Sequence, residues 1–173
     1  MNFKKNLKSA NFLLFLGICL ITIGCVFYFL KTKEVVQIIP KVTSPPDLTF
    51  AKVTRVIDGD TIVIDTGEKI RYIGINTPEL EISECYATEA SGINQSLVLD
   101  KVVRLEKDTS ETDKYGRLLR YVYVGNDFIN NELVKNGSAR VETVKPDIKY
   151  EGEFVTWQKF AEQNKLGLWG KCI

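Results

Sequence analysis

Residues 49–75 read TFAKVTRVIDGDTIVIDTGEKIRYIGI, and this stretch decides the fold class. Three of its runs, 49–57, 61–65 and 69–75, are rich in β-branched residues and are separated by an Asp-Gly turn and a Thr-Gly turn. Short runs of this composition between turn residues are typical of strands joined by hairpins. We therefore predict a three-stranded meander here.

Downstream of the meander, the spacing of the apolar residues changes to that of a helix and then returns to that of a strand. A helix capped by Thr88 is predicted to run to about residue 99, and strands are predicted at 102–106 and 118–124. Two further helices are predicted at about 129–135 and 151–165. The order β-β-β-α-β-β-α-α indicates an α+β domain built on a five-stranded OB-fold β-barrel, a fold that often binds oligonucleotides but does not by itself reveal function.

The N-terminal segment has a different character. Residues 12–30 form 19 uncharged positions, nearly all apolar, which is about the length that a helix needs to cross a bilayer core. Lysines within residues 1–11 place that end in the cytoplasm by the positive-inside rule. We expect an uncleaved transmembrane helix, because signal peptides have apolar regions of only about 7 to 15 residues. If the leader is cleaved, the protein is secreted.

The remaining organisation follows from this leader. Residues 31–48 include three prolines and are expected to form an extended linker. Residues 49–173 then form one domain outside the cytoplasm, held at the cell membrane by the single N-terminal anchor. The membrane is thus an expected partner through the helix, and we infer no protein partner.

The charge of the chain divides at the same place. Lys and Arg number 6 before Asp47 and 17 from there on, whereas Asp and Glu number 1 and 21, so the leader carries +5 and the remainder −4. An acidic body does not attract nucleic acid by bulk charge, so binding of phosphate would need a local site. The chain has no histidine, which excludes histidine-based triads, zincins and histidine nucleases and leaves carboxylate and arginine chemistry.

Three segments carry residues suited to that chemistry. Asp58-Gly59-Asp60-Thr61 brings two carboxylates near one point, as a hard cation requires, although a plain turn is the commoner explanation. In the run that follows, alternation is expected to place Arg71 on one face with Ile73 and Ile75, where its charge needs an anion, either a bound one or a neighbouring acid in a salt bridge. Thr77-Pro78-Glu79 then leaves the strand in a rigid turn that holds the glutamate in place.

The third segment is Thr112-Asp113-Lys114-Tyr115-Gly116-Arg117, in the connection between the last two strands. It supplies an ammonium, a phenol and a second guanidinium, all of which bind phosphate, although a solvated loop is again the ordinary explanation. Together, D-G-D-T, R-x-x-x-x-N-T-P-E and D-K-Y-G-R resemble, in order and approximate spacing, the motifs of the staphylococcal nuclease (thermonuclease) family. The resemblance covers residues 49–170 and implies a calcium-dependent endonuclease that hydrolyses phosphodiester bonds of DNA or RNA.

The resemblance also implies a calcium site. Asp60 matches the principal carboxylate ligand, with Asp58 in an auxiliary role. Asn76 and the backbone carbonyl of Thr77 match the other protein ligands. Oxygen donors of this kind are those that Ca²⁺ prefers.

The remaining matched positions are implied to act on the substrate. Glu79 matches the carboxylate that orients or deprotonates the attacking water. Arg71 and Arg117 match the pair that grips the scissile phosphate. Lys114 and Tyr115 match groups near the terminal phosphate of a bound nucleotide.

Three features depart from the best-known member of the family. Asn76 stands in place of an aspartate, so we expect weaker calcium binding. Glu142 and Val144 stand in place of tyrosines that contact the base, which puts base stacking and substrate preference in doubt. The stretch Leu80 to Tyr86 is shorter than that member's flexible loop. Besides an active nuclease, these features allow a catalytically weak or silent OB-fold module that binds nucleic acid or protein, or a merely structural surface domain.

The cysteines divide between the leader and the body. Cys19 and Cys25 lie inside the predicted transmembrane helix, which leaves Cys85 and Cys172 as the pair in the body. If the body is exported, we expect these two to form a disulfide, and two free thiols are the alternative.

Overall fold

The computed structural model of the protein describes residues 48–172. The predicted cytoplasmic N-terminus, the predicted helix at 12–30 and all but the last residue of the predicted linker lie outside this range, so those assignments stay predictions. None of the helices within residues 48–172 combines the length and the apolar character that a membrane crossing needs.

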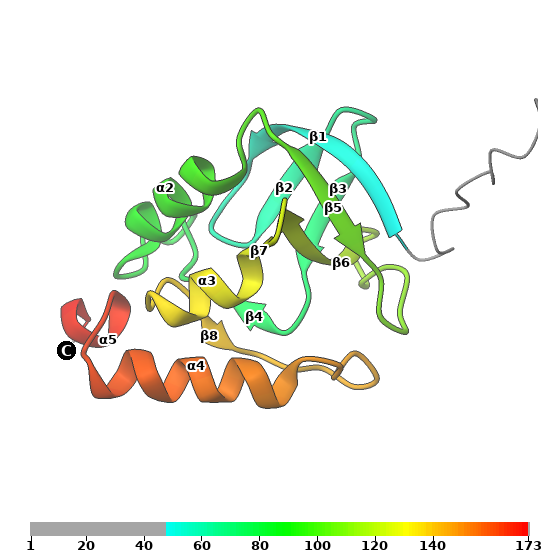
Figure 1. The fold of residues 1–173 in the computed structure, drawn as a ribbon. Helices are drawn as coiled ribbons and strands as arrows, with labels where there is room; N and C mark the ends of the chain where they lie inside the picture. The colour runs from blue at the N-terminus through cyan, green and yellow to red at the C-terminus, as the bar shows by residue number, and fades with distance from the viewer. Residues whose placement is uncertain (1–47, 173) are drawn as a thin grey trace, which may run out of the picture. The chain divides into compact units, whose positions relative to one another are not determined.

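Five strands close into the predicted barrel (Figure 1). They are β1 (Leu48–Val56), β2 (Thr61–Ile64), β3 (Lys69–Tyr72), β5 (Val102–Glu106) and β6 (Leu118–Val124). Neighbours in the order β3-β2-β1-β5-β6 pair antiparallel, and a parallel pairing of β3 with β6 joins the two ends. The structure therefore confirms a five-stranded mixed β-barrel in an α+β domain.

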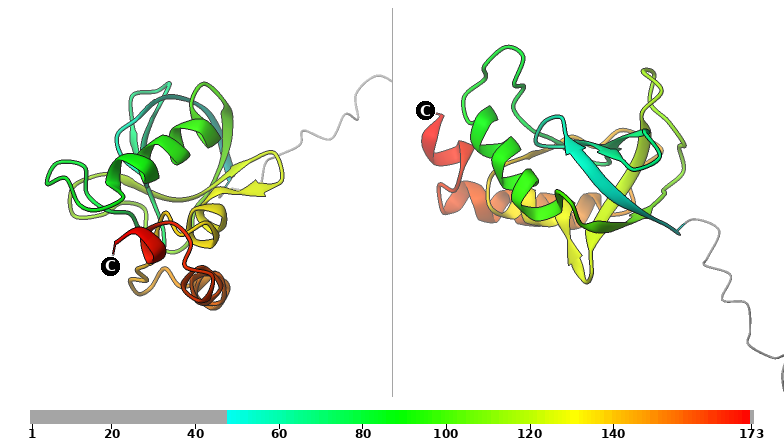
Figure 2. Two further views of the ribbon diagram at one scale, coloured as in Figure 1. Left: turned by 90° about the vertical axis from the view of Figure 1, so that its left-hand side faces the viewer. Right: turned by 90° about the horizontal axis from the view of Figure 1, so that it is seen from above.

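Helices and three short strands complete the domain. The helices are α2 (Ala87–Val98), α3 (Ile129–Lys135), α4 (Glu151–Gln163) and α5 (Leu168–Lys171), and the short strands are β4 (Ile75–Asn76), β7 (Asp127–Phe128) and β8 (Arg140–Val141). Figure 2 shows α2 across one end of the barrel, with α3, α4 and α5 gathered on one side of it. The helices predicted at 88–99, 129–135 and 151–165 are all present, with ends that differ by two residues at most.

The third predicted strand is wrong in its extent. It was expected to run from 69 to 75, with Arg71, Ile73 and Ile75 on one face, but β3 ends at Tyr72. The chain turns at Gly74, which has a φ of 79° and lies so close to Phe154 that a Cβ there would be 2.6 Å from the ring. The strand is broken where α4 packs against the turn, so strand alternation does not extend from Arg71 to Ile75.

The predicted cap of the first helix is also wrong. The helix begins at Ala87 rather than after Thr88, and no side chain caps it. Tyr86 stands at its N-terminus in the left-handed conformation, with a φ of 72°. The backbone turn itself, with the Ala87 N–H bonded to the carbonyl of Glu84, starts the helix.

The core joins the barrel to the helices that follow it. Aromatic rings from β6 and α4 meet here, with the Tyr121 and Phe154 ring centroids 6.2 Å apart and Tyr121 and Tyr150 4.7 Å apart. Burying each such side chain stabilises the fold by roughly 1.5–3 kcal/mol. This packing joins β6 and α4 in one hydrophobic core.

Candidate active site

Asp60 is the most enclosed charged residue of the candidate site. It ends the turn after β1, and only 4% of its surface is exposed. Its Oδ2 accepts the backbone N–H of Thr77 at 2.7 Å and the Thr77 hydroxyl at 3.1 Å. Its Oδ1 accepts the hydroxyl of Thr61 at 3.1 Å. Two of the three sequence motifs thus meet at one carboxylate.

Gly59 makes this meeting sterically feasible. A Cβ at this position would lie 2.7 Å from the side chain of Thr77. Residue 59 must therefore lack a side chain for the turn to pack against the Thr77-Pro78-Glu79 segment. Asp58, on the other side of the glycine, uses its Oδ1 to accept the backbone N–H of Asp60 at 3.0 Å, so it supports the turn.

Arg71 reaches the same carboxylate from β3. The register pairs Arg71 with Thr61 across β2 and β3, which sets the guanidinium beside Asp60. Its Nη1 lies 3.1 Å from Oδ1 of Asp60 and donates to the carbonyl of Ile75 at 2.8 Å, while its Nη2 donates to Oδ1 of Asn76 at 2.9 Å. The predicted phosphate-binding arginine therefore contacts two of the predicted calcium ligands.

Arg117 approaches from the loop that precedes β6. Its Nε lies 2.6 Å from Oδ2 of Asp113, and its Nη1 lies 3.4 Å from the Thr61 hydroxyl. Since that hydroxyl in turn donates to Asp60, the second guanidinium is linked to the buried carboxylate through one side chain. The structure thus brings Asp60, Asn76, Thr77, Arg71 and Arg117 together.

The environment of Asp60 makes its charge costly. Burial is the largest influence and raises the pKa of Asp60 to about 6, while Arg71 and the bonds from Thr77 offset part of that rise and Asp58 adds to it. The Arg71 guanidinium therefore does not fully compensate the Asp60 carboxylate for its loss of hydration. A further positive charge at this place would stabilise the ionised form.

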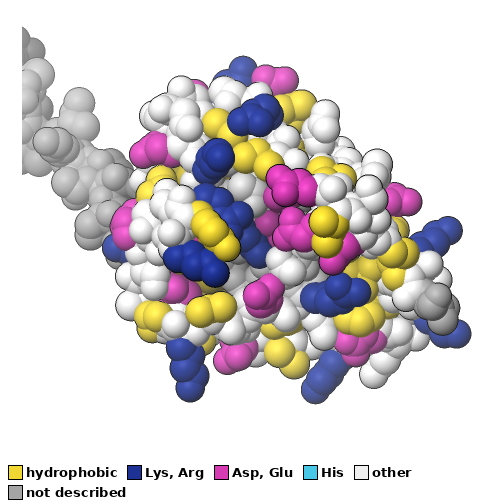
Figure 3. All heavy atoms as spheres, turned by 180° about the vertical axis from the view of Figure 1, so that it is seen from behind, with side chains coloured by type: hydrophobic (Ala, Val, Ile, Leu, Met, Phe, Trp, Pro, Cys, Tyr) yellow, Lys and Arg dark blue, Asp and Glu magenta, His cyan; other side chains and the backbone are white. Residues whose placement is uncertain are grey.

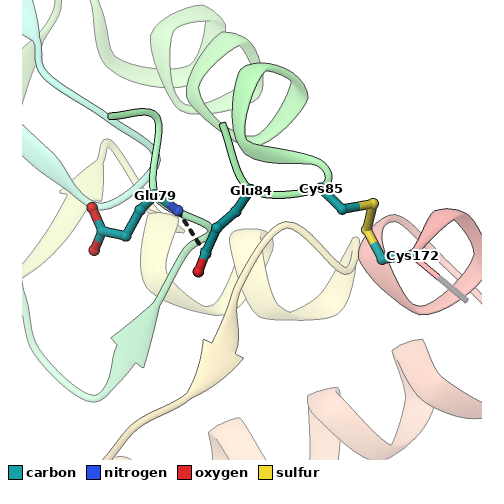
Figure 4. The surroundings of a disulfide bond; sticks show 4 residues. All are labelled: Glu79, Glu84, Cys85 and Cys172. Carbon is teal, nitrogen blue, oxygen red and sulfur yellow. Dashed lines mark hydrogen bonds between the residues drawn. A yellow bond between two sulfur atoms is a disulfide. The ribbon is translucent and has the colours of Figure 1, made fainter. Parts of the chain in front are cut away.

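Glu79 is placed differently from the other predicted residues. It follows Thr77-Pro78 and is therefore tethered to the Asp60 cluster through the backbone, but its side chain is exposed. Its backbone N–H donates to Oε2 of Glu84 at 2.9 Å, and its own carboxylate points away from Glu84 (Figure 4). The sequence alone did not predict this contact, because Glu84 lies outside the three motifs.

A cavity of about 490 Å³ opens beside Arg71. Arg117, Lys114 and Tyr115 line it together with Arg71, so the predicted substrate-binding residues share one space. Tyr115 is 72% exposed at the rim. On the face opposite to that of Figure 1, basic and acidic side chains gather next to one another (Figure 3). The cavity lining is likewise of mixed charge, with Arg71, Lys114, Arg117 and Lys145 beside Asp113, Glu142 and Asp147.

The far wall of the cavity is formed by the chain after β8. It includes Glu142, Val144 and Lys145, and Val144 is 65% exposed. Asp147, which sequence reasoning missed, also lines the cavity, and its Oδ1 accepts the backbone N–H groups of Thr109 and Ser110 at 2.9 and 2.7 Å. This contact spans nearly 40 positions, so no local pattern could have indicated it.

The donor set fits calcium in kind. The Asp60 carboxylate, the Asn76 amide oxygen and the Thr77 carbonyl are hard oxygen donors, and the buried carboxylate calls for added positive charge. Within residues 48–172, no group of three or more Asp, Glu or Cys side chains is arranged to hold a metal ion. An ion here would rely on one carboxylate, neutral oxygens and water, which is a weak type of site.

The structure joins Cys85 and Cys172 in a disulfide, the pair expected from the sequence (Figure 4). Their Cα atoms lie 5.7 Å apart, across a separation of 87 residues. The bond connects the segment just before α2 to the end of α5.

Comparison with known proteins agrees with this arrangement. Residues 69–171 match the family model described as staphylococcal nuclease homologue. The chain is 40% identical to the thermonucleases of Staphylococcus hyicus and Staphylococcus intermedius, over 68% of this chain and 74% of each relative. It is 42% identical to Endonuclease YncB of Bacillus subtilis (strain 168), over 68% of this chain and 60% of that protein. These matches confirm the family indicated by the three motifs: the chain belongs to the staphylococcal nuclease family.

Proposed function

We propose that this nuclease is a calcium-dependent endonuclease that hydrolyses phosphodiester bonds of DNA or RNA from outside the cytoplasm, tethered to the membrane by residues 12–30. One observation carries the catalytic part of the proposal. Oδ1 of Asp60 lies 3.1 Å from Nη1 of Arg71, and the Thr61 hydroxyl links the same carboxylate to Arg117 by hydrogen bonds. A metal-binding carboxylate and two guanidinium groups therefore border one place, as phosphodiester hydrolysis requires.

The two arginines bind the phosphate. Arg71 already donates from both terminal nitrogens to protein oxygens, so its orientation is set before substrate arrives. Arg117 is oriented by Asp113 through its Nε, which leaves Nη2 for a phosphoryl oxygen. Guanidinium groups suit this role because they stay protonated and can bond two oxygens at once.

Asp60, Asn76 and the carbonyl of Thr77 would hold calcium next to these arginines. When bound, the ion supplies positive charge to the phosphoryl oxygens and lowers the pKa of a coordinated water. Pre-aligned groups that face developing negative charge are usually the largest contribution to such catalysis.

Glu79 orients or deprotonates the attacking water. Its carboxylate is exposed, it follows the Thr77-Pro78 turn that is bonded to Asp60, and the chain has no histidine that could act as the base instead. Lys114 and Tyr115, which line the cavity, lie near the terminal phosphate of the bound nucleotide.

The base of the nucleotide meets a wall without aromatic rings. Val144 and Glu142 line the cavity where stacking would otherwise occur. Stacking contributes about 1–3 kcal/mol per base in single-strand binders, so binding here depends mainly on phosphate contacts.

A catalytically weak or silent binding module is the second candidate. Two observations favour it: Asn76 leaves one carboxylate at the metal site, and Arg117 is paired with Asp113 at 2.6 Å. Such a module would bind an oligonucleotide in the same cavity without cutting it.

Digestion of plasmid DNA and of RNA by the purified full chain in mild detergent tests these alternatives. The nuclease proposal predicts cleavage with calcium, none with chelator, and loss of cleavage in Glu79→Gln and in Arg71→Ala. Binding of oligonucleotide without any cleavage would favour the silent module instead. A protein that neither binds nor cleaves the oligonucleotide would contradict both alternatives.

The membrane tether is tested separately. The full chain should sediment with membranes and resist extraction by high salt, and protease added outside intact cells should remove residues 49–173. A variant lacking residues 1–46 should not sediment. Recovery of the full chain in the soluble cell fraction would contradict the tether.

A further inference from the structure

Glu79 is not packed into the cavity, yet a catalytic base must be held in place to act. The segment that follows it supplies two contacts to its backbone. Its N–H donates to Oε2 of Glu84 at 2.9 Å, and its carbonyl accepts the backbone N–H of Glu84 at 3.1 Å. Residues 79–84 thus form a short loop closed at its base by one residue pair, which we call the 79–84 clamp (Figure 4).

The clamp lies next to the disulfide. Cys85 directly follows Glu84 and is bonded to Cys172. Glu79 and Glu84 are both exposed, so water competes for the clamp hydrogen bonds, and each by itself is weak. A covalent attachment one residue away limits the motion of Glu84 and keeps its carboxylate opposite the Glu79 N–H.

The other end of the disulfide is firmly held. Leu168 donates its N–H to the carbonyl of Gly137 at 2.9 Å. A Cβ added at Gly167 would lie 2.3 Å from that carbonyl oxygen, so the two backbones are in direct contact. Because α5 is only four residues long, Cys172 stands close to this contact between α5 and the end of α3.

From this geometry we infer that Glu84 and the Cys85–Cys172 disulfide are positioning groups for the proposed base Glu79. The anchored C-terminus fixes Cys85, Cys85 fixes Glu84, and Glu84 fixes the backbone of Glu79. The other side of Glu79 is fixed by Thr77, which is bonded to Asp60. The short Leu80–Tyr86 stretch is therefore a braced loop. The inference rests on the proposed function insofar as it assigns Glu79 a catalytic role.

Activity measurements on the full chain test the catalytic part. Glu84→Ala and Cys85→Ser/Cys172→Ser should lower kcat about 10- to 100-fold, because small displacements of a catalytic group have effects of this size, with KM within about twofold. Glu84→Gln keeps an acceptor oxygen and should restore most of kcat. Glu81→Gln, in the same loop and also exposed, is the matched control and should behave as wild type.

A mutant cycle separates positioning from general stability. If Glu84 acts through Glu79, then Glu84→Ala should not lower further the residual kcat that Glu79→Gln retains at high enzyme concentration. An equal loss of kcat in both backgrounds would overturn the inference. So would wild-type kcat in both Glu84→Ala and the double serine variant.

Hydrogen exchange at the Glu79 amide is a readout that does not need activity. Exchange should be about tenfold faster or more in Glu84→Ala and in the double serine variant than in wild type, measured well below the temperature at which either unfolds. Unchanged exchange would overturn the inference. If exchange is faster in the variants but the wild-type protein itself does not cleave nucleic acid, the result would support the positioning of Glu79 and count against the proposed function.

Discussion

Thr77 donates both its backbone N–H and its hydroxyl to the same oxygen of Asp60, at 2.7 and 3.1 Å. This relationship joins residues 17 positions apart and leaves the other carboxylate oxygen to Thr61 and Arg71. The turn that carries Asp60 and the segment that ends at Glu79 are thereby held as one unit. Changes on either side should therefore affect calcium binding and catalysis together.

Asn76→Asp should tighten calcium binding. The variant adds a second carboxylate next to Asp60, so we expect the Kd for calcium to fall about tenfold, measured by titration calorimetry. Asn126→Asp adds the same charge in an exposed turn and should leave the Kd unchanged. Equal Kd values for Asn76→Asp and wild type would show that residue 76 is not a ligand.

Arg71→Lys and Arg117→Lys should each lower kcat about 100-fold or more, because lysine keeps the charge but loses the planar pair of donors. Steady-state cleavage of a single-stranded oligonucleotide measures this. Arg55→Lys, at an exposed position on β1, is the control. Near wild-type kcat in either site variant would remove that arginine from the phosphate site.

Asp113→Asn should impair Arg117 rather than the barrel. Burial by itself would raise the pKa of Asp113, but the hydrogen bonds from Arg117 and Tyr115 outweigh it and lower the pKa, so the group is ionised at neutral pH. Loss of the charge-assisted bond to Arg117 should lower kcat/KM about tenfold. Asp127→Asn, exposed on β7, should have no such effect. A rise in kcat/KM would mean that Asp113 restrains Arg117 instead of aiming it.

Glu106 should make stability depend on pH. Burial acts to raise the pKa of Glu106, but the bonds from Lys149 and Tyr150 outweigh it and hold the pKa below its ordinary value. The stabilisation is therefore complete above the unfolded pKa of about 4.3 and is lost as pH falls through the lower folded pKa.

Urea unfolding of Glu106→Gln measures this effect. Because half of the Lys149 side chain is exposed, the variant should lose only about 1 kcal/mol at pH 7, and the difference from wild type should shrink below about pH 4. Glu81→Gln, exposed in a loop, should have the same free energy of unfolding as wild type both at pH 7 and below pH 4. A difference that grows toward low pH would contradict the assignment.

The sequence predicted the barrel well because its strands are bounded by strong turn signals. Asp58-Gly59 and Thr66-Gly67 mark where β1, β2 and β3 meet. The break at Gly74 was missed because it depends on the ring of Phe154, 80 positions away. Thr88 was a reasonable cap by type, but Tyr86 in a left-handed conformation starts the helix two residues earlier.

The site was predicted as far as motifs reach. The family resemblance assigned Arg71 and Asp60 to one site, and the hairpin register that carries Arg71 opposite Thr61 brings them together. The partners that orient the motif residues, such as Glu84 beside Glu79 and Asp147 under Thr109, are ordinary acidic residues by sequence. Only the closed barrel brings Asp147 to its partner, and only the turn after Pro78 brings Glu84 to Glu79.

The central claim is that calcium bound at Asp60 works with Arg71 and Arg117 on one phosphate. The most direct test is the rate of oligonucleotide cleavage across a calcium titration, for wild type and for Asp60→Asn. We predict that the wild-type rate rises to saturation with calcium and falls to background with chelator, while Asp60→Asn stays near background throughout. Cleavage that persists in chelator, or an Asp60→Asn variant with wild-type rates, would contradict the claim.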